Sequence, residues 1–261
     1  MKYQTLVVEK STYFLQIGFN RIDKGNAYNQ QMLEELINLF NEIEANRDIR
    51  LVILKSRGRH FQLGADLDWL FKVSLQGEDT NIDVTSLINC FFKKLRNLQV
   101  PLVGLVDGAC TGGGVGILSN CDIVVADKKS YFSISEVKWG LAPSIILPSV
   151  IKAIGRRNAF RYSLTAERFD AVKAKEIGLV HEVCNNDQLD SKVNEIVTAI
   201  LENDFAAVMR TKKDLKSVSF EISQECEDTL KESHYKMRMG SGFRQGYKYF
   251  MSKKNSDLNK K

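Results

Sequence analysis

The sequence predicts an α/β fold, and three observations support that prediction. Apolar, β-branched runs at residues 51–55 and 101–106 have the composition of buried strands. Each run is followed by a glycine-containing turn and then by apolar residues at helical spacing. The chain has 261 residues, of which 44% are hydrophobic, so it can bury a sizeable core as one domain or as a domain with an appendage. Repeated strand–turn–helix units of this kind indicate an α/β architecture.

The N-terminal elements are predicted to be a hairpin, a loop and a helix. Strands are expected at residues 6–9 and 13–19, and a polar loop at residues 20–29. Apolar residues recur at helical spacing from residue 32 to residue 46, and Asn29 is the expected N-cap of this helix.

The rest of the chain is predicted to change from mixed to mainly helical. Polar residues 71–82, with Gly77, suggest a mobile loop between a helix near Asp68 and a helix at 85–98. Residues 255–261 are polar and are expected to be disordered. The remaining predicted elements are strands at 123–126 and 131–134 and helices at 145–154, 188–202, 205–216, 223–239 and 243–251.

Composition excludes several classes of protein. The chain has neither a run of eighteen apolar residues nor the features of a secretory signal, and its five cysteines are odd in number and lack paired spacing. We therefore expect a cytoplasmic protein with reduced thiols, no membrane segment and no metal site. The net charge of +5 comes from basic clusters in the C-terminal half, but no recognition motif accompanies them, so a nucleic-acid partner is not expected.

The segment with the strongest functional signal is a glycine-rich turn between a strand and a helix. Five glycines fall within residues 108–116, and the backbone N–H groups that begin the following helix have no partners inside it. Such a turn can bind a phosphate, stabilise an oxyanion or simply pack closely against a neighbour. The pattern matches neither the G-x-G-x-x-G motif nor a P-loop.

A second glycine turn, at Gly64, favours the oxyanion among these alternatives. Residues 60–70 follow another strand and again pass through a glycine into a helix with apolar periodicity. Two backbone N–H groups offered from two separate turns are what an oxyanion hole requires.

Four stretches in a fixed order resemble one family. They are Gly-Ala-Asp-Leu at 64–67, Gly-Gly-Gly at 112–114 with Cys-Asp-Ile at 121–123, Ser-Glu-Val-Lys-Trp-Gly-Leu at 135–141, and Leu-Thr-Ala-Glu-Arg-Phe-Asp-Ala at 164–171 with Gly-Leu-Val at 178–180. From about residue 6 to residue 183 the chain resembles the crotonase, or enoyl-CoA hydratase/isomerase, superfamily. The resemblance implies a ββα spiral core at residues 1–195 and a C-terminal helical region at 196–261 that assembles homotrimers or hexamers.

The resemblance also implies roles for individual residues. The N–H groups of Ala65 and Gly113 would hold the thioester oxygen of an acyl-CoA, and Glu136 would be the acid/base. No cofactor is implied beyond the coenzyme A of the substrate. The residues placed at coenzyme A or its acyl group are Lys24, Ala27, Leu63, Gly64, Ala65, Asp68, Gly112, Gly113, Gly116, Phe250 and Lys253.

One residue departs from the family pattern. Hydratases of the family usually carry a first glutamate at the position of Gly116, twenty residues before Glu136. The motifs look closest to 3-methylglutaconyl-CoA hydratases, which favours hydration of a 2-enoyl-CoA with one glutamate. A Δ3,Δ2-enoyl-CoA isomerase is the alternative, and a non-catalytic protein that binds acyl-CoA or RNA is a third possibility.

Three further expectations concern titratable residues. Burial beside Ile134 and Trp139 should raise the pKa of Glu136 toward neutrality. A carboxylated acyl tail would need a cation, for which Lys72 and Lys138 are the candidates. The three histidines, His60, His181 and His234, have no metal-site spacing and are expected to have structural roles.

Overall fold

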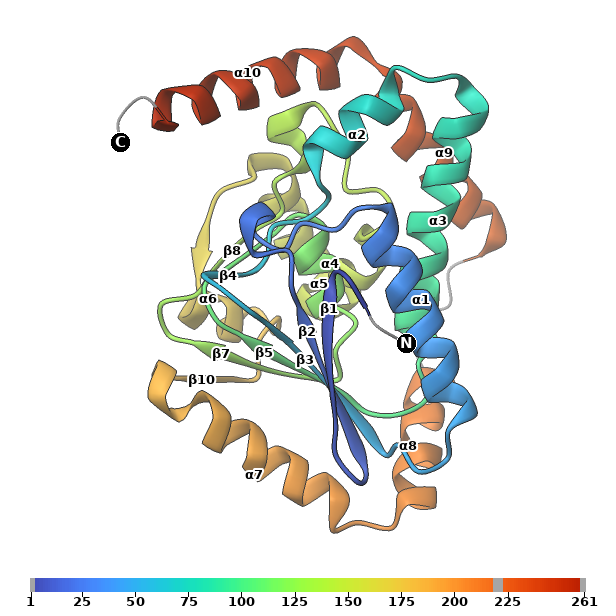
Figure 1. The fold of residues 1–261 in the computed structure, drawn as a ribbon, viewed down its shortest axis with the longest axis vertical. Coiled ribbons are helices and arrows are strands. Elements are labelled where there is room, and N and C mark those ends of the chain that lie inside the picture. The colour runs from blue at the N-terminus through green and yellow to red at the C-terminus, as the bar shows by residue number, and fades with distance from the viewer. Residues whose placement is uncertain (1–2, 218–222, 259–261) are drawn as a thin grey trace.

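Two β-sheets form the centre of the computed structural model, which describes residues 3–217 and 223–258 (Figure 1). The larger sheet has the order β1-β2-β3-β5-β7-β10 and the smaller the order β4-β6-β8-β9. The strands are β1 Leu6–Lys10, β2 Phe14–Phe19, β3 Leu51–Ser56, β4 His60–Gln62, β5 Leu102–Val106, β6 Ala109–Thr111, β7 Ile123–Asp127, β8 Tyr131–Ser133, β9 Phe169–Asp170 and β10 Glu182–Cys184.

Helices surround these sheets in the described residues. They are α1 Gln30–Ala45, α2 Leu67–Ser74, α3 Glu78–Asn97, α4 Gly113–Leu118, α5 Leu147–Thr165, α6 Ala171–Glu176, α7 Leu189–Leu201, α8 Phe205–Ser217, α9 Gln224–Met239 and α10 Ser241–Leu258. Short 3₁₀ helices lie at Ile22–Lys24, Glu136–Trp139 and Asn186–Gln188. Gly155 interrupts α5, because its φ of 72° and ψ of 155° are not helical.

The chain winds as a ββα spiral. β3, β5 and β7 lie in the larger sheet, and the strands that follow them, β4, β6 and β8, lie in the smaller one. A helix follows each pair, namely α2, α4 and, after a 3₁₀ turn, α5. Pairing along each row is parallel, while β1–β2 and β8–β9 are antiparallel. The predicted α/β fold of crotonase type is therefore confirmed.

The core follows from the predicted periodicity. Asn29 caps α1 by accepting a hydrogen bond from the backbone N–H of Met32 at 3.1 Å, as expected. The buried face of α1 packs on α3, where the rings of Phe40 and Phe91 stack at 6.2 Å. The amphipathic helix α7 covers the other side of the larger sheet with the buried side chains Leu189, Val193 and Val197.

The prediction of a mobile loop at residues 71–82 is wrong. Most of that segment is helical, since α2 runs to residue 74 and α3 begins at residue 78. Asn81 provides the reason, because its buried side-chain amide lies 2.9 Å from the carbonyl of Val73 and 3.1 Å from that of Gly77. These contacts join the last turn of α2 to Gly77, the N-cap residue of α3, and fix a tight turn between the two helices.

The C-terminal helix α10 is longer than predicted. It begins at Ser241 and includes residues 255–258, where disorder was expected, while residues 259–261 lie outside the described part of the chain. Tertiary packing explains the difference. Gly246 lets α10 approach the Glu136–Trp139 turn so closely that a Cβ on it would lie 2.7 Å from Trp139 Cα.

Figure 1 shows α10 and α7 at opposite ends of the molecule. The predicted boundary at residue 195 falls within α7, and trimer or hexamer assembly stays a prediction. None of the described helices is both long and apolar enough to cross a membrane.

Candidate active site

Two glycine turns lie against each other where the strands of the smaller sheet end. Gly64 has a φ of 88° and Gly112 a φ of 54°, in the region that favours glycine. A Cβ on Gly64 would lie 3.2 Å from both the backbone nitrogen of Gly113 and the carbonyl oxygen of Thr111. Glycine is therefore needed at position 64 for both conformation and space.

The turns present two unpaired N–H groups. The N–H of Gly112 donates to the carbonyl of Ser133 at 2.8 Å, but Gly113, the first residue of α4, has no partner inside its helix. Within residues 3–217 and 223–258, neither the Ala65 nor the Gly113 N–H has an acceptor in the protein. Two free donors on touching turns can bind an oxygen that gains negative charge.

Glu136 lies beside these turns at the start of its 3₁₀ helix. Its Oε1 is 3.3 Å from the point where a Cβ on Gly112 would stand, and its Oε2 is buried without a hydrogen-bond partner in the described chain. Burial raises the pKa of Glu136 to about 7, although the backbone N–H groups of Ser135 and Glu136 oppose this shift. The expected direction of the pKa shift is confirmed, and a carboxyl group with this pKa can both accept and return a proton near neutral pH.

One pocket, enclosing about 570 Å³ including its open mouth, contains all these groups. Of the predicted site residues, Leu63, Gly64, Ala65, Gly112, Gly113 and Glu136 line it. The rest of the wall is mostly apolar. Its other lining residues are Tyr28, Leu67, Leu70, Ile88, Phe92, Ser135, Trp139, Leu141, Ala142, Pro143, Ile145, Ile146 and His234.

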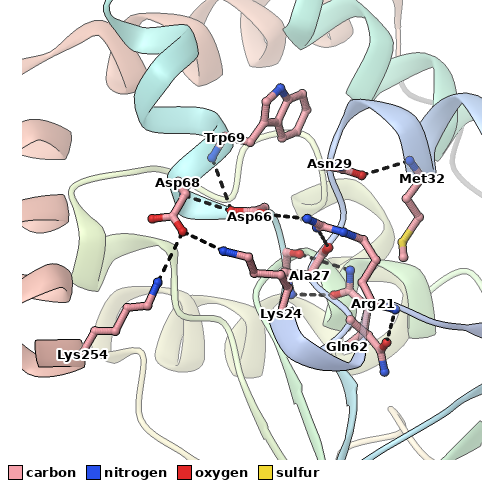
Figure 2. A network of polar contacts seen from close by, with 12 residues as sticks. Arg21, Lys24, Ala27, Asn29, Met32, Gln62, Asp66, Asp68, Trp69 and Lys254 are labelled. Atoms are coloured by element: carbon pink, nitrogen blue, oxygen red, sulfur yellow. Dashed lines mark hydrogen bonds and ion pairs between the residues drawn. The ribbon is translucent and has the colours of Figure 1, made fainter. Parts of the chain in front are cut away.

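A second group of predicted residues forms a polar network outside the pocket lining (Figure 2). Asp68 Oδ2 is 3.1 Å from Lys24 Nζ, and its Oδ1 accepts a hydrogen bond from the Tyr247 hydroxyl at 2.9 Å. Ala27 contributes a backbone carbonyl that accepts from Arg21. These contacts join the loop before α1, the start of α2 and α10.

The contact of Phe250 and Lys253 with the coenzyme A of a neighbouring subunit stays a prediction, and within this chain both residues lie against aromatic side chains. Phe250 packs edge-on against Trp139, with ring centroids 5.6 Å apart, and the Lys253 ammonium lies 4.8 Å from the centroid of the Tyr249 ring. The lysine of α10 that reaches Asp68 is Lys254, at 3.5 Å. Neither Phe250 nor Lys253 lines the pocket.

Gly116 lies behind the pocket wall. A Cβ placed on it would be 2.7 Å from Ile146 Cβ and 3.1 Å from Phe92 Cε1, and both of these residues line the pocket. Apolar side chains therefore occupy the place of the first family glutamate, so Glu136 is the carboxylate of this pocket.

Sequence reasoning missed two polar residues of the pocket. Tyr28 packs so closely on the second turn that a Cβ on Gly113 would lie 2.5 Å from its hydroxyl oxygen. His234 lines the pocket from α9, whereas a purely structural role was expected. His181 keeps the expected role, since its Nδ1 accepts from the Val124 N–H at 3.0 Å. The sequence did contain one signal for His234. Arg238 lies one helical turn further along the predicted helix, and side chains at this spacing are neighbours on a helix.

The two-sheet spiral, with paired glycine turns beside one buried carboxylate, defines a protein of crotonase type. Comparison with known proteins agrees, because a family model described as enoyl-CoA hydratase/isomerase matches residues 9–261. The chain therefore belongs to the enoyl-CoA hydratase/isomerase family.

Relatives with different activities share similar levels of sequence identity with this chain. The chain is 28% identical over 253 residues to a mevalonyl-coenzyme A hydratase of Aspergillus fumigatus, covering 95% of this chain and 92% of the relative. It is 31% identical over 241 residues to a peroxisomal Δ3,5-Δ2,4-dienoyl-CoA isomerase of Arabidopsis thaliana, covering 85% of each. Among solved structures, an enoyl-CoA hydratase from Shewanella pealeana matches with a TM-score of 0.80 and 32% identity, covering 97% of this chain and 95% of that one. The comparisons therefore show the family but do not distinguish hydration from isomerisation.

Proposed function

We propose that the protein adds water to the double bond of a 2-enoyl-CoA, with 3-methylglutaconyl-CoA as the first substrate to test. The observation that supports this function is the position of Glu136, a carboxyl with a pKa of about 7, beside the unpaired N–H groups of Ala65 and Gly113. The two donors would stabilise an enolate oxygen, and each such donor typically contributes about 3–4 kcal/mol to a transition state.

A polar corner of the pocket suits a water molecule. Glu136 Oε1 and Ser135 Oγ each lie 3.3 Å from the same point above Gly112, and the Tyr28 hydroxyl lies close to Gly113. A bound water needs two to four polar partners, and this corner offers them. In the proposed reaction Glu136 takes a proton from the water, the hydroxide oxygen bonds to the β-carbon, and the thioester oxygen becomes an enolate. Glu136 then returns the same proton to the α-carbon, so one carboxylate serves both steps.

Isomerisation is the second candidate function, and the packing at Gly116 favours it. With Ile146 and Phe92 in place of a second carboxylate, a single acid/base must suffice. Glu136 would remove a proton from the α-carbon of a 3-enoyl-CoA and return it to the γ-carbon, with the same N–H groups holding the dienolate oxygen.

The proposal also covers the residues that bind coenzyme A and the oligomeric state of the protein. We assign Lys24, Ala27, Asp68, Phe250 and Lys253 to the coenzyme A side of the site, with the phosphates met by the lysines, in a homotrimer or hexamer. No additional cofactor is proposed. The third candidate function is binding of acyl-CoA without turnover, or binding of RNA.

Mass analysis of the products distinguishes these functions. Purified protein is incubated with 3-methylglutaconyl-CoA, crotonyl-CoA and a 3-enoyl-CoA, and the experiment is repeated with Glu136→Gln. Addition of one water to a 2-enoyl-CoA, lost in the variant, supports hydration. A shifted double bond without added water identifies an isomerase and is followed by the absorbance of the conjugated 2-enoyl thioester, because isomerisation leaves the mass unchanged. Binding without turnover refutes both functions. Glu167→Gln is the matched control, because Glu167 is a partly exposed carboxylate paired with Arg161 and does not line the pocket.

A further inference from the structure

A buried arginine without a carboxylate partner lies close behind the pocket. The side chain of Arg238, on α9, is completely buried. Its Nε donates to Asn81 Oδ1 at 3.0 Å, and its Nη2 donates to the Asn81 carbonyl at 2.5 Å and to Thr85 Oγ1 at 3.1 Å. All of these acceptors are neutral, and in the described part of the chain no carboxylate pairs with Arg238. A buried positive charge of this kind is expensive to desolvate and favours negative charge nearby.

The remaining contact of Arg238 fixes the state of His234. Arg238 Nη1 lies 3.3 Å from His234 Nδ1, and Thr85 Oγ1 lies 3.2 Å from the same nitrogen. An arginine has only donors, so His234 Nδ1 must be the acceptor and the ring proton must sit on Nε2. Burial and the Arg238 charge lower the pKa of His234 to about 3, so the imidazole stays neutral at physiological pH.

This arrangement adds one oriented donor to a pocket whose wall is mostly apolar. His234 lines the pocket, as do Ile88, Phe92, Ile145 and Ile146. Its Nε2 has no hydrogen-bond partner among the described residues. A lone N–H donor backed by a cation selects a hydrogen-bond acceptor, and one with negative charge above all.

We propose that His234 is a specificity residue whose Nε2–H donates to a carboxylate at the far end of the acyl group, with Arg238 and Thr85 holding the ring and Arg238 supplying the favourable charge. The inference rests on the proposed function only in that the pocket takes an acyl-CoA. His234 takes the role that the sequence analysis gave to Lys72 or Lys138 as the partner of a carboxylated acyl tail. Both lysines are exposed, and neither lines the pocket.

Binding of saturated thioesters tests this inference without any turnover. The dissociation constants of glutaryl-CoA and pentanoyl-CoA, which have acyl chains of equal length, are measured by titration calorimetry. Because a hydrogen bond to a charged group contributes about 1.5–3 kcal/mol, the wild type should bind glutaryl-CoA at least about tenfold more tightly. His234→Phe removes the hydrogen bond but leaves the Arg238 charge, so it should reduce this preference by about tenfold, with a much smaller effect on the affinity for pentanoyl-CoA. His234→Gln, whose amide N–H can take the place of Nε2–H, should restore part of the preference.

Two further measurements separate the inference from its alternatives. The ratio of the glutaryl-CoA preferences of wild type and His234→Phe should be constant from pH 6 to pH 9, because His234 is neutral throughout and the ionisation of Glu136, whose pKa is about 7, affects both proteins alike. A protonated histidine would instead make this ratio fall in the same range. The monomethyl ester of glutaryl-CoA should bind like pentanoyl-CoA. Equal affinities of wild type for glutaryl-CoA and pentanoyl-CoA, or a preference that is undiminished in His234→Phe, would overturn the inference. Absence of hydration or isomerisation with the preference intact would instead count against the proposed function alone.

Discussion

Ile146 stands where a side chain on Gly116 would have to be, since a Cβ on that glycine would lie 2.7 Å from Ile146 Cβ. The position that carries a first glutamate in related hydratases is thus closed by hydrophobic packing and is not a water-filled gap. Proton transfer in this pocket consequently depends on Glu136, whose Oε2 has no partner in the described protein.

Gly116→Ala tests this packing. The added methyl group should lower the free energy of unfolding by about 1–2 kcal/mol, because overpacking outweighs the better helix propensity of alanine. Ile146→Ala should make the substitution better tolerated, so the double variant should be less destabilised than the sum of the single variants. Urea denaturation measures all three. Gly242→Ala is the control, since a Cβ there would lie 3.8 Å from the Gly140 carbonyl oxygen, at ordinary van der Waals distance. A comparable loss of stability in this variant would refute the steric explanation.

Gly64→Ala tests the oxyanion turns. Its methyl group would lie 3.2 Å from the Gly113 nitrogen, against one of the proposed donors, so kcat/KM should fall by about 100-fold or more. Strain must be separated from blocked chemistry, because Gly64 has a φ of 88°. Gly178→Ala is the matched control, with a φ of 90° at a position that does not line the pocket. Both variants should lose stability in thermal denaturation, and an equal loss of activity in both would argue against the oxyanion role.

Asp68→Asn tests how α10 is held in place. The substitution removes the charge that faces Lys24 and Lys254 and weakens the acceptor for the Tyr247 hydroxyl. Because these ion pairs are partly exposed, global stability should fall by less than about 1 kcal/mol. Amide hydrogen exchange in α10 should nevertheless become faster, since the helix loses a polar anchor. The stacked rings of Phe71 and Tyr247, 4.0 Å apart, should keep α10 attached. Unchanged exchange would mean that packing alone holds this helix.

Local signals in the sequence predicted the parts of the site that depend on short segments. The Gly64 and Gly112 turns and the Asn29 cap each form within a few residues, so these features can be predicted from residues close together in the sequence. The burial of Glu136 was also predictable, because apolar residues flank its turn.

Contacts between distant segments were not predictable in the same way. Ile146 fills the space at Gly116 from thirty positions further along the chain, and no local pattern specifies that contact. Asn81 donates to the carbonyls at the α2–α3 turn and accepts from Arg238, 157 positions away. The helical spacing of His234 and Arg238 was visible in the sequence, but the pocket beside them was not.

The raised pKa of Glu136 should make stability depend on pH. In the folded protein its pKa is about 7, against an ordinary value of 4.5, so between these values the folded state holds a proton that the unfolded chain has released. The free energy of unfolding should therefore fall as the pH rises from about 4.5 to about 7, by roughly 3 kcal/mol in total. Glu136→Gln cannot lose a proton and should lack this decline, becoming more stable than wild type above pH 7.

Urea denaturation of both proteins between pH 4 and pH 8 measures the difference. The comparison cancels the titration of every other group that the substitution leaves unchanged, so the gap between the two curves belongs to Glu136. Glu167→Gln should behave differently, because Arg161 lowers the pKa of Glu167 and the sign of its dependence is reversed. Parallel curves for wild type and Glu136→Gln would show that the carboxyl ionises as easily in the fold as in the unfolded chain. Glu136 would then lack the raised pKa on which the proposed acid/base chemistry depends.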